Sequence, residues 1–104
     1  MEVRFEQKYL KELYTDAKSD KKHRYQPQII RKYIHIIDLM KAEKNILGLM
    51  KYNSLRYEKL SGDKEGLSSV RVNDQYRIEF EEQIKDNEMT ATICNIMELS
   101  NHYH

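Results

Sequence analysis

Apolar and polar residues alternate along two neighbouring stretches in the second half of the chain. In the stretch Leu67 to Asn73, Val70 and Val72 are separated by polar or charged residues. In the next stretch the apolar positions are Tyr76, Ile78 and Phe80, and the charged positions are Arg77, Glu79 and Glu81. A period of two is typical of a strand with one buried face. These stretches therefore predict paired strands with one apolar face and a second face that carries Arg71 and Arg77.

Turn-forming residues flank these two predicted strands. Asn73-Asp74-Gln75 stands between them, and Gly62-Asp63 and Lys64-Glu65-Gly66 precede the first. Glycine supplies a positive φ, and an aspartate side chain bonds to its own backbone, so both residue types favour tight turns.

Two stretches in the first half repeat their apolar residues every three or four positions, which is the period of a helix. They run from Lys8 to Ala17 and from Pro27 to Lys44. Pro27 suits a first helical turn, where its missing N–H costs nothing. Residues 18–24 form a polar connection, and residues 45–52 are expected to form a short helical turn that returns the chain to the sheet.

Three further strands complete the expected sheet. They are Met1 to Gln7, Leu55 to Leu60 and Met89 to Met97. In the second of these, Tyr57 and Lys59 fall on one side and Arg56 and Glu58 on the other. Residues 85–88 are expected to form a hairpin turn, and residues 98–104 a tail. The order β-α-α-β-β-β-β predicts one α+β domain over residues 1–104, with two helices packed on one face of a twisted, mainly antiparallel sheet.

Composition and charge narrow the classes of partner. Of the 104 residues, 39% are hydrophobic and 34% are charged, and the net charge is +1. Such a chain is not expected to hold naked nucleic acid tightly, although a local basic cleft remains open. The lone Cys94 is expected to be a small core residue in a reducing cytoplasm. Since no apolar run approaches a membrane span, we expect a cytoplasmic protein without membrane contact.

The residue types leave few kinds of catalytic site. Glycines at 48, 62 and 66 make no phosphate-cradling loop, and one Cys with scattered Ser residues makes no nucleophile constellation. His102 and His104 lack carboxylate or Cys partners for a metal, so no metal or cofactor is expected. Two arginines on one sheet face instead indicate an anion site. The alternative is that Glu79 or Glu98 pairs with them in ordinary salt bridges.

Residues 60–78 resemble the HigB branch of the RelE/ParE toxin superfamily. That family shows an L-x-G-D-[RK]-x-G turn followed by S-[IV]-R-[IV]-N-x-x-[WY]-R-[IL]. This chain has LSGDKEG at residues 60–66 and SVRVNDQYRI at residues 69–78. Its residues 101–104, Asn-His-Tyr-His, are similar to the short family tail with a Tyr-His or His-Tyr pair. The resemblance implies a RelE-like fold.

The resemblance also implies site residues. In HigB-like and related RelE-like ribonucleases the Arg of the [WY]-R-[IL] strand binds the scissile phosphate, which implies that role for Arg77, and Arg71 matches the second motif Arg. A terminal His beside Tyr transfers a proton, which implies His104 or His102; the register leaves both open. The remaining candidates are a third cation, Lys59, and the RNA contacts Tyr103, Tyr57, Tyr76 and Asn73.

The function implied is that of a toxin in a type II toxin–antitoxin pair, acting as an mRNA endonuclease in the ribosomal 30S A site. Attack of a 2′-OH on the adjacent phosphate would give a 2′,3′-cyclic phosphate and a 5′-OH without metal. The other expected partner is a HigA-like helix-turn-helix antitoxin. The toxin itself would contact DNA only indirectly, through this antitoxin. The alternatives are a ParE-like gyrase inhibitor, and an inactive antitoxin-binding co-repressor in which Glu79, Glu81 and Glu82 neutralise Arg77.

Overall fold

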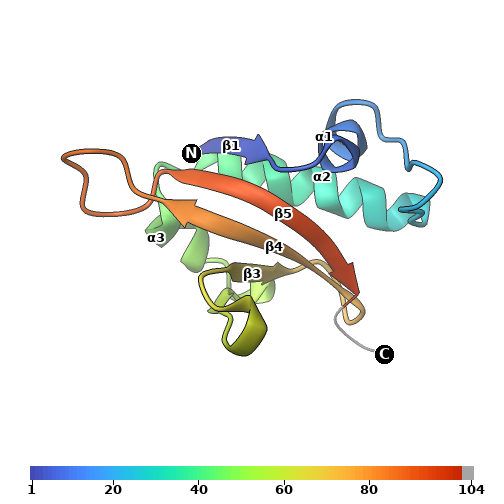
Figure 1. The fold of residues 1–104 in the computed structure, drawn as a ribbon. Helices are drawn as coiled ribbons and strands as arrows, with labels where there is room; N and C mark the ends of the chain where they lie inside the picture. Colours follow the sequence, from blue (N-terminus) through green and yellow to red (C-terminus); the bar gives the residue numbers. More distant parts are fainter. Residues whose placement is uncertain (102–104) are drawn as a thin grey trace.

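The computed structural model describes residues 1–101, within which the sheet has five strands in the order β1-β5-β4-β3-β2. The strands are β1 (Glu2–Phe5), β2 (Glu58–Lys59), β3 (Ser68–Arg71), β4 (Tyr76–Gln83) and β5 (Ile93–Asn101). β1 runs parallel to β5, and the other neighbours are antiparallel. The helices are α1 (Lys8–Thr15), α2 (Pro27–Ala42) and α3 (Ile46–Met50). The expected α+β architecture with a mainly antiparallel sheet is confirmed (Figure 1).

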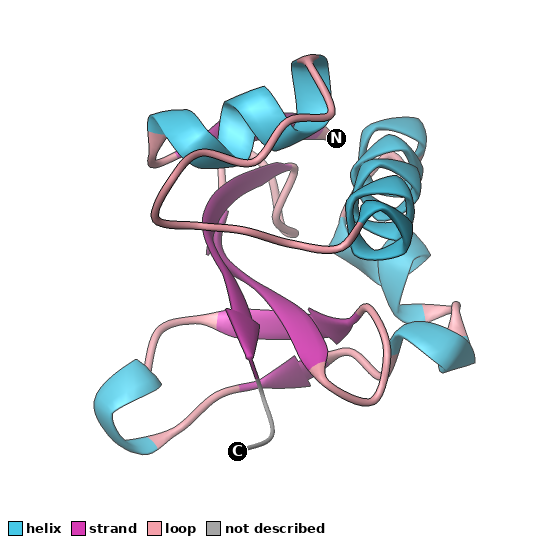
Figure 2. Ribbon diagram, turned by 90° about the vertical axis from the view of Figure 1, so that its right-hand side faces the viewer, coloured by secondary structure: helices cyan, strands magenta, loops and turns pink. Residues whose placement is uncertain are grey.

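Helices α1 and α2 lie on the same side of the curved sheet (Figure 2). Their apolar stripes meet the apolar face of β3, β4 and β5, so the hydrophobic core lies between helices and sheet. Its largest fully buried side chains include Leu10, Leu13, Tyr33, Ile37, Met40, Ile78, Phe80 and Ile96. The hydroxyl of Tyr33 donates to the carbonyl oxygen of Leu10 at 2.8 Å, which ties α2 to α1 and satisfies the one polar group of this side chain. None of the helices within residues 1–101 has the length and hydrophobicity of a membrane-spanning segment.

The alternation in β3 and β4 decides which side chains enter this core. Val70 lies opposite Ile78 and both are fully buried, whereas Arg71 lies opposite Arg77 on the other face. This confirms the predicted hairpin and its two faces. The glycines of the preceding turn, Gly62 and Gly66, have φ values of 67° and 95°, as that turn requires.

Two strands differ from the sequence prediction. Leu55 belongs to a 3-10 turn (η1, Asn53–Leu55) that ends at Arg56 with a positive φ of 45°, so β2 shrinks to Glu58–Lys59. β5 begins at Ile93 rather than Met89 and continues to Asn101, so residues 98–101 are strand and not tail. The reason is pairing: β4 extends back to Tyr76, and its edge accepts β5 up to Asn101.

A third difference concerns the face that the helices leave uncovered. Ser69 and Glu79 point to this face, yet both are buried. The cover comes in part from Lys64 in a second 3-10 turn (η2, Gly62–Lys64), whose ammonium contacts the Glu79 carboxylate.

Cys94 is fully buried as expected, and burial raises the pKa of its thiol to about 12.

Two methionines at opposite extremes of exposure test the position of the core. Met40 is 0% exposed and Met89 is 95% exposed. We expect Met40→Ala to lower the free energy of unfolding by about 2 to 5 kcal/mol, because it opens a cavity between α2 and the sheet. Met89→Ala should change it by less than about 0.5 kcal/mol. Urea denaturation measures both, and equal losses would contradict this core.

Candidate functional site: an arginine-lined cleft

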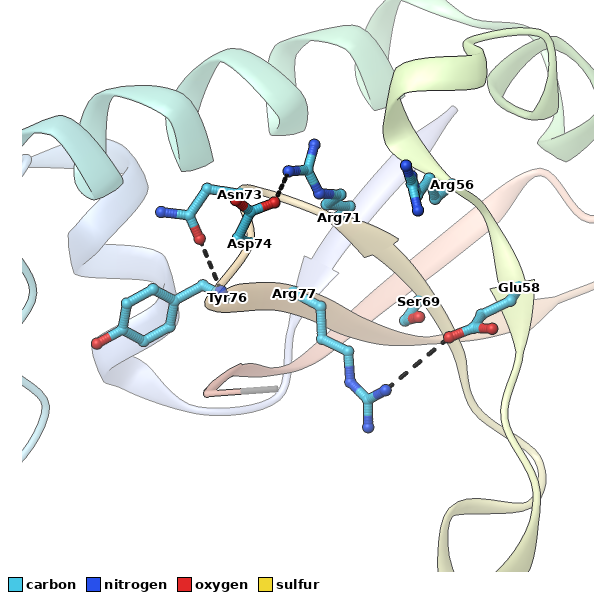
Figure 3. Close-up of a pocket in the computed structure, with 8 residues that line it drawn as sticks. All are labelled: Arg56, Glu58, Ser69, Arg71, Asn73, Asp74, Tyr76 and Arg77. Atoms are coloured by element: carbon cyan, nitrogen blue, oxygen red, sulfur yellow. Dashed lines mark hydrogen bonds and ion pairs between the residues drawn. The ribbon is translucent and has the colours of Figure 1, made fainter. Parts of the chain in front are cut away.

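A cleft of about 250 Å³ lies at the β3–β4 hairpin, on the sheet face opposite α1 and α2. Its lining comes from the segment before β2, from β2, and from the hairpin and its turn (Figure 3). The lining residues are Arg56, Glu58, Ser69, Arg71, Asn73, Asp74, Tyr76 and Arg77. The cleft therefore gathers side chains that lie up to 21 positions apart in the sequence (56 to 77).

The hairpin turn fixes the register that brings the arginines together. The side-chain oxygen of Asn73 accepts hydrogen bonds from the backbone N–H groups of Gln75 (2.9 Å) and Tyr76 (2.7 Å). This is the turn that an asparagine side chain stabilises by replacing a backbone acceptor. Arg71 and Arg77 then lie opposite each other on the sheet face that the helices leave uncovered. Asn73 thus lines the cleft, and its side-chain oxygen holds the turn.

Arg77 is the most firmly held of the arginines. Its side chain is 16% exposed, and its Nε donates to Oε2 of Glu79 at 2.8 Å. Its terminal Nη1 lies 3.9 Å from Oε1 of Glu58, an exposed carboxylate across the cleft (Figure 3). The pairing of Glu79 with Arg77, which the sequence offered only as the alternative to an anion site, is present. The guanidinium therefore has one side fixed by a buried carboxylate and its end turned toward solvent.

Arg71 and Arg56 complete the basic lining. Arg71 pairs with Asp74, which belongs to the turn and is 96% exposed, and not with Glu98. Arg56 was not singled out from the sequence as a site residue. The signal was present, because the alternation around Tyr57 places Arg56 and Glu58 on the same side. Its positive φ is uncommon for a residue other than glycine and is found more often than average at functional sites.

The side chains that line the cleft carry a small net positive charge. Among the described residues, the arginines at 56, 71 and 77 are partly offset by the carboxylates Glu58 and Asp74. Both carboxylates are exposed, so an incoming anion with more charge and more oxygens can replace them at small desolvation cost. Guanidinium groups bind phosphate oxygens through paired donors. The arrangement is thus suited to an anion with phosphate geometry.

Lys59 and Tyr57 lie elsewhere. Lys59 pairs with Ser68 on β3, so it does not share the strand face of Arg71. It lines a separate depression together with Ser68 and Glu82. The Tyr57 hydroxyl donates to the Glu82 carboxylate, and burial, followed by this bond, raises the pKa of Tyr57 to about 12. The structure does not bring either residue to the arginines.

Tyr76 lines the cleft, but its ring is directed away from Arg77 (Figure 3). The ring packs edge-on against Tyr25, with centroids 5.5 Å apart. The Tyr25 hydroxyl in turn donates to the carbonyl oxygen of Leu99 on β5 at 2.8 Å. Tyr76 is therefore an anchored aromatic group at the edge of the cleft.

The remaining predicted residues, His102, Tyr103 and His104, lie outside the described part of the chain. β5 carries the chain toward the cleft immediately before them. Ser100 lies opposite Arg77, and Asn101 lies opposite Tyr76.

The chain is similar to known proteins over most of its length. The profile of a family described as "RelE-like toxin of type II toxin-antitoxin system HigB" matches residues 3–96, which include Arg71 and Arg77. Toxin HigB-1 of Vibrio cholerae serotype O1 is 36% identical over 85 residues, which cover 78% of this chain and 83% of that protein.

Solved structures share the fold at low sequence identity. A YoeB/ParE toxin from Agrobacterium tumefaciens has a TM-score of 0.56 at 17% identity, and the match covers 99% of this chain and 100% of the other. A single-residue mutant of YafQ from E. coli has a TM-score of 0.56 at 12% identity, with 97% and 92% covered. YoeB from Staphylococcus aureus, solved as a dimer, has a TM-score of 0.52 at 20% identity, with 99% and 98% covered.

The exposed carboxylate of Asp74 provides a test of the anion site. Asp74→Asn removes the negative charge that pairs with Arg71, so we expect inorganic triphosphate to bind about threefold to tenfold more tightly at low salt. Asp86→Asn, in the distant β4–β5 hairpin turn, is the matched control and should bind as wild type does. Isothermal titration calorimetry measures both. Equal affinities for all three proteins would show that the cleft is not where triphosphate binds.

Proposed function

The chain belongs to the HigB-like family of RelE-type toxins of type II toxin–antitoxin systems, and from this premise we propose that it is a ribosome-dependent mRNA endonuclease. Members of this family are typically ribosome-dependent mRNA endonucleases. The observation that carries the proposal is the position of Arg77, whose guanidinium is anchored on one side and open to the cleft on the other. The scissile phosphate of the message is the proposed occupant of this cleft.

The reaction needs no group beyond side chains. The 2′-OH loses its proton to a base, its oxygen attacks the adjacent phosphorus, and the bond to the 5′-oxygen breaks. That oxygen takes a proton from an acid, which leaves a 2′,3′-cyclic phosphate and a 5′-OH. Negative charge grows on the phosphate oxygens on the way, and fixed guanidinium donors stabilise such charge better than water does. The terminal nitrogens of Arg77 are the proposed donors, and Arg71 and Arg56 line the same cleft.

His102 or His104 is the proposed proton-transfer residue. Imidazole changes its protonation near neutral pH and so serves as either acid or base. Among residues 1–101, the cleft lining contains no histidine. β5 brings the chain to Arg77 just before the two tail histidines, and this supports the assignment.

The charge balance favours a reaction that depends on the ribosome. Glu58 and Asp74 offset part of the arginine charge in the cleft, and the whole chain has a net charge of only +1. Binding of free RNA depends largely on the number of phosphates that cations neutralise. A cleft of this kind would hold free mRNA weakly and would rely on the ribosomal A site to present it.

A type II toxin has a cognate antitoxin. We propose that this partner is a HigA-like helix-turn-helix protein, and that the toxin reaches operator DNA only through it. The proposed substrate places the toxin in the cytoplasm, where it meets translating ribosomes.

Cleavage during translation in vitro is the direct test. With a defined message and wild-type protein, primer extension should map new 5′ ends that appear only when ribosomes are present. Arg77→Ala should lower the cleavage rate about 100- to 1,000-fold, because it removes donors to the phosphate in the transition state. Arg31→Ala, on the exposed face of α2, is the matched control and should cleave normally. A toxic wild-type protein that makes no cuts would contradict the proposal and direct attention to a gyrase supercoiling assay.

The same assay assigns the proton-transfer residue. Of His102→Ala and His104→Ala, we expect one to lower the rate about 100- to 10,000-fold and to remove a limb of the pH–rate profile between pH 5 and 8. His35→Ala, on the exposed side of α2, should leave rate and profile unchanged. If the double substitution of His102 and His104 retains the wild-type rate, neither histidine transfers the proton.

A further inference from the structure

Glu79 is a buried carboxylate on the sheet face that the helices do not cover. Its side chain is 2% exposed, although Arg77 on the same strand and face reaches solvent. A buried charge is unfavourable unless opposite charges and hydrogen bonds surround it. Glu79 meets this requirement with Lys64, whose Nζ lies 2.9 Å from Oε1 and 2.7 Å from Oε2, and with Nε of Arg77 at 2.8 Å from Oε2.

Two cations therefore share one carboxylate. If Arg77 were the only partner of Glu79, the pair would be neutral and a substrate phosphate would have to compete with Glu79 for the guanidinium. Lys64 contacts both carboxylate oxygens, so it supplies the charge that Glu79 needs. Arg77 is then held by Glu79 and still presents a net positive charge to the cleft.

The contact also selects which nitrogens of Arg77 are available. A guanidinium can bind an anion side-on, through Nε and one terminal nitrogen, or end-on, through both terminal nitrogens. Glu79 occupies Nε. Nη1 faces the cleft, where the exposed Glu58 carboxylate lies 3.9 Å away. The arrangement therefore prepares Arg77 for an end-on contact.

We propose that Glu79 and Lys64 are positioning residues that fix the guanidinium of Arg77 for end-on binding of the scissile phosphate. The proposal rests on the proposed nuclease function for its catalytic consequence, but the fixed guanidinium is a property of the protein alone. An ion network that only stabilised the hairpin would not require a terminal nitrogen of Arg77 to face the cleft, as Nη1 does. A donor set in place before the reaction needs no reorganisation during it.

The first measurement concerns the free protein. In nitrogen-15 NMR, the Nε–H signal of Arg77 is identified by its absence in Arg77→Lys. In Glu79→Gln its hydrogen exchange should be about tenfold faster, because a neutral amide oxygen, which is a weaker acceptor, replaces the charged carboxylate. Glu81→Gln is the matched control: it removes a carboxylate from the same strand whose hydrogen bond comes from Gln83 at 2.8 Å. It should leave the Arg77 signal unchanged.

The second measurement is cleavage with ribosomes, as kcat and KM. Glu79→Gln should lower kcat about 10- to 100-fold, since a misplaced donor acts mainly on the transition state. Glu79→Asp should recover part of the loss. Lys64→Met should mainly raise KM, because Glu79 then competes with phosphate for Arg77. Glu81→Gln should match wild type in both.

The outcomes separate positioning from stability and from the nuclease function itself. Thermal unfolding identifies a temperature at which each variant is folded. If Glu79→Gln has a lower unfolding midpoint but keeps wild-type kcat and slow Nε–H exchange, Glu79 is structural only and the proposal is wrong. If Glu79→Gln does not fold, a wild-type KM in Lys64→Met overturns it. If wild-type protein cuts no message, the nuclease function fails, and the NMR comparison alone decides whether Glu79 fixes Arg77.

Discussion

The alternation of side chains along β4 couples the hydrophobic core to the cleft. Ile78 and Phe80 must point toward α1 and α2 to be buried, and the same pleat sends Arg77 and Glu79 to the opposite face. A slip of one residue would exchange the two faces and would bury the arginine against the helices. The free energy of core burial therefore also fixes the direction of Arg77. In this sense the helices position the cleft, although they contribute none of its lining among residues 1–101.

The opposite face of the sheet is held by charge rather than by apolar contact. Glu79 is buried there because Lys64 reaches it from the η2 turn, 15 positions earlier in the chain. Replacing a buried ion pair with apolar residues is often neutral or stabilising, so the presence of such a pair is weak evidence that it stabilises the fold. What apolar side chains cannot provide is a directed acceptor for Nε of Arg77. The network is therefore better explained by the orientation it gives to Arg77 than by its contribution to the free energy of folding.

The features that the sequence predicted are those set by local periodicity. The two faces of the hairpin, and the meeting of Arg71 with Arg77, follow from alternation and from a turn of known type. The missed features depend on distant contacts. The burial of Glu79 needs Lys64, and the extension of β5 through residues 98–101 needs the edge of β4. Lys59 shows the limit most clearly: its charge suggested a role in the site, but its phase in β2 places it on the other side.

Under the proposed function, the carboxylates in the cleft help to explain how the toxin is kept from cutting RNA at random. Glu58 and Asp74 are exposed, so they add little to stability, yet each lies against an arginine that would otherwise be open to any phosphate. Their attraction for a guanidinium is weak enough for a well-placed phosphodiester to overcome. The same carboxylates repel a phosphodiester that arrives by diffusion, but only close to the cleft, because exposed charges act over about a Debye length of 8 Å. Under the proposed function, selectivity for ribosome-bound message would then arise partly from what opposes binding in the free protein. In this proposal the arginines supply the transition-state contacts, and the neighbouring carboxylates raise the concentration of phosphate that is needed to displace them from the arginines.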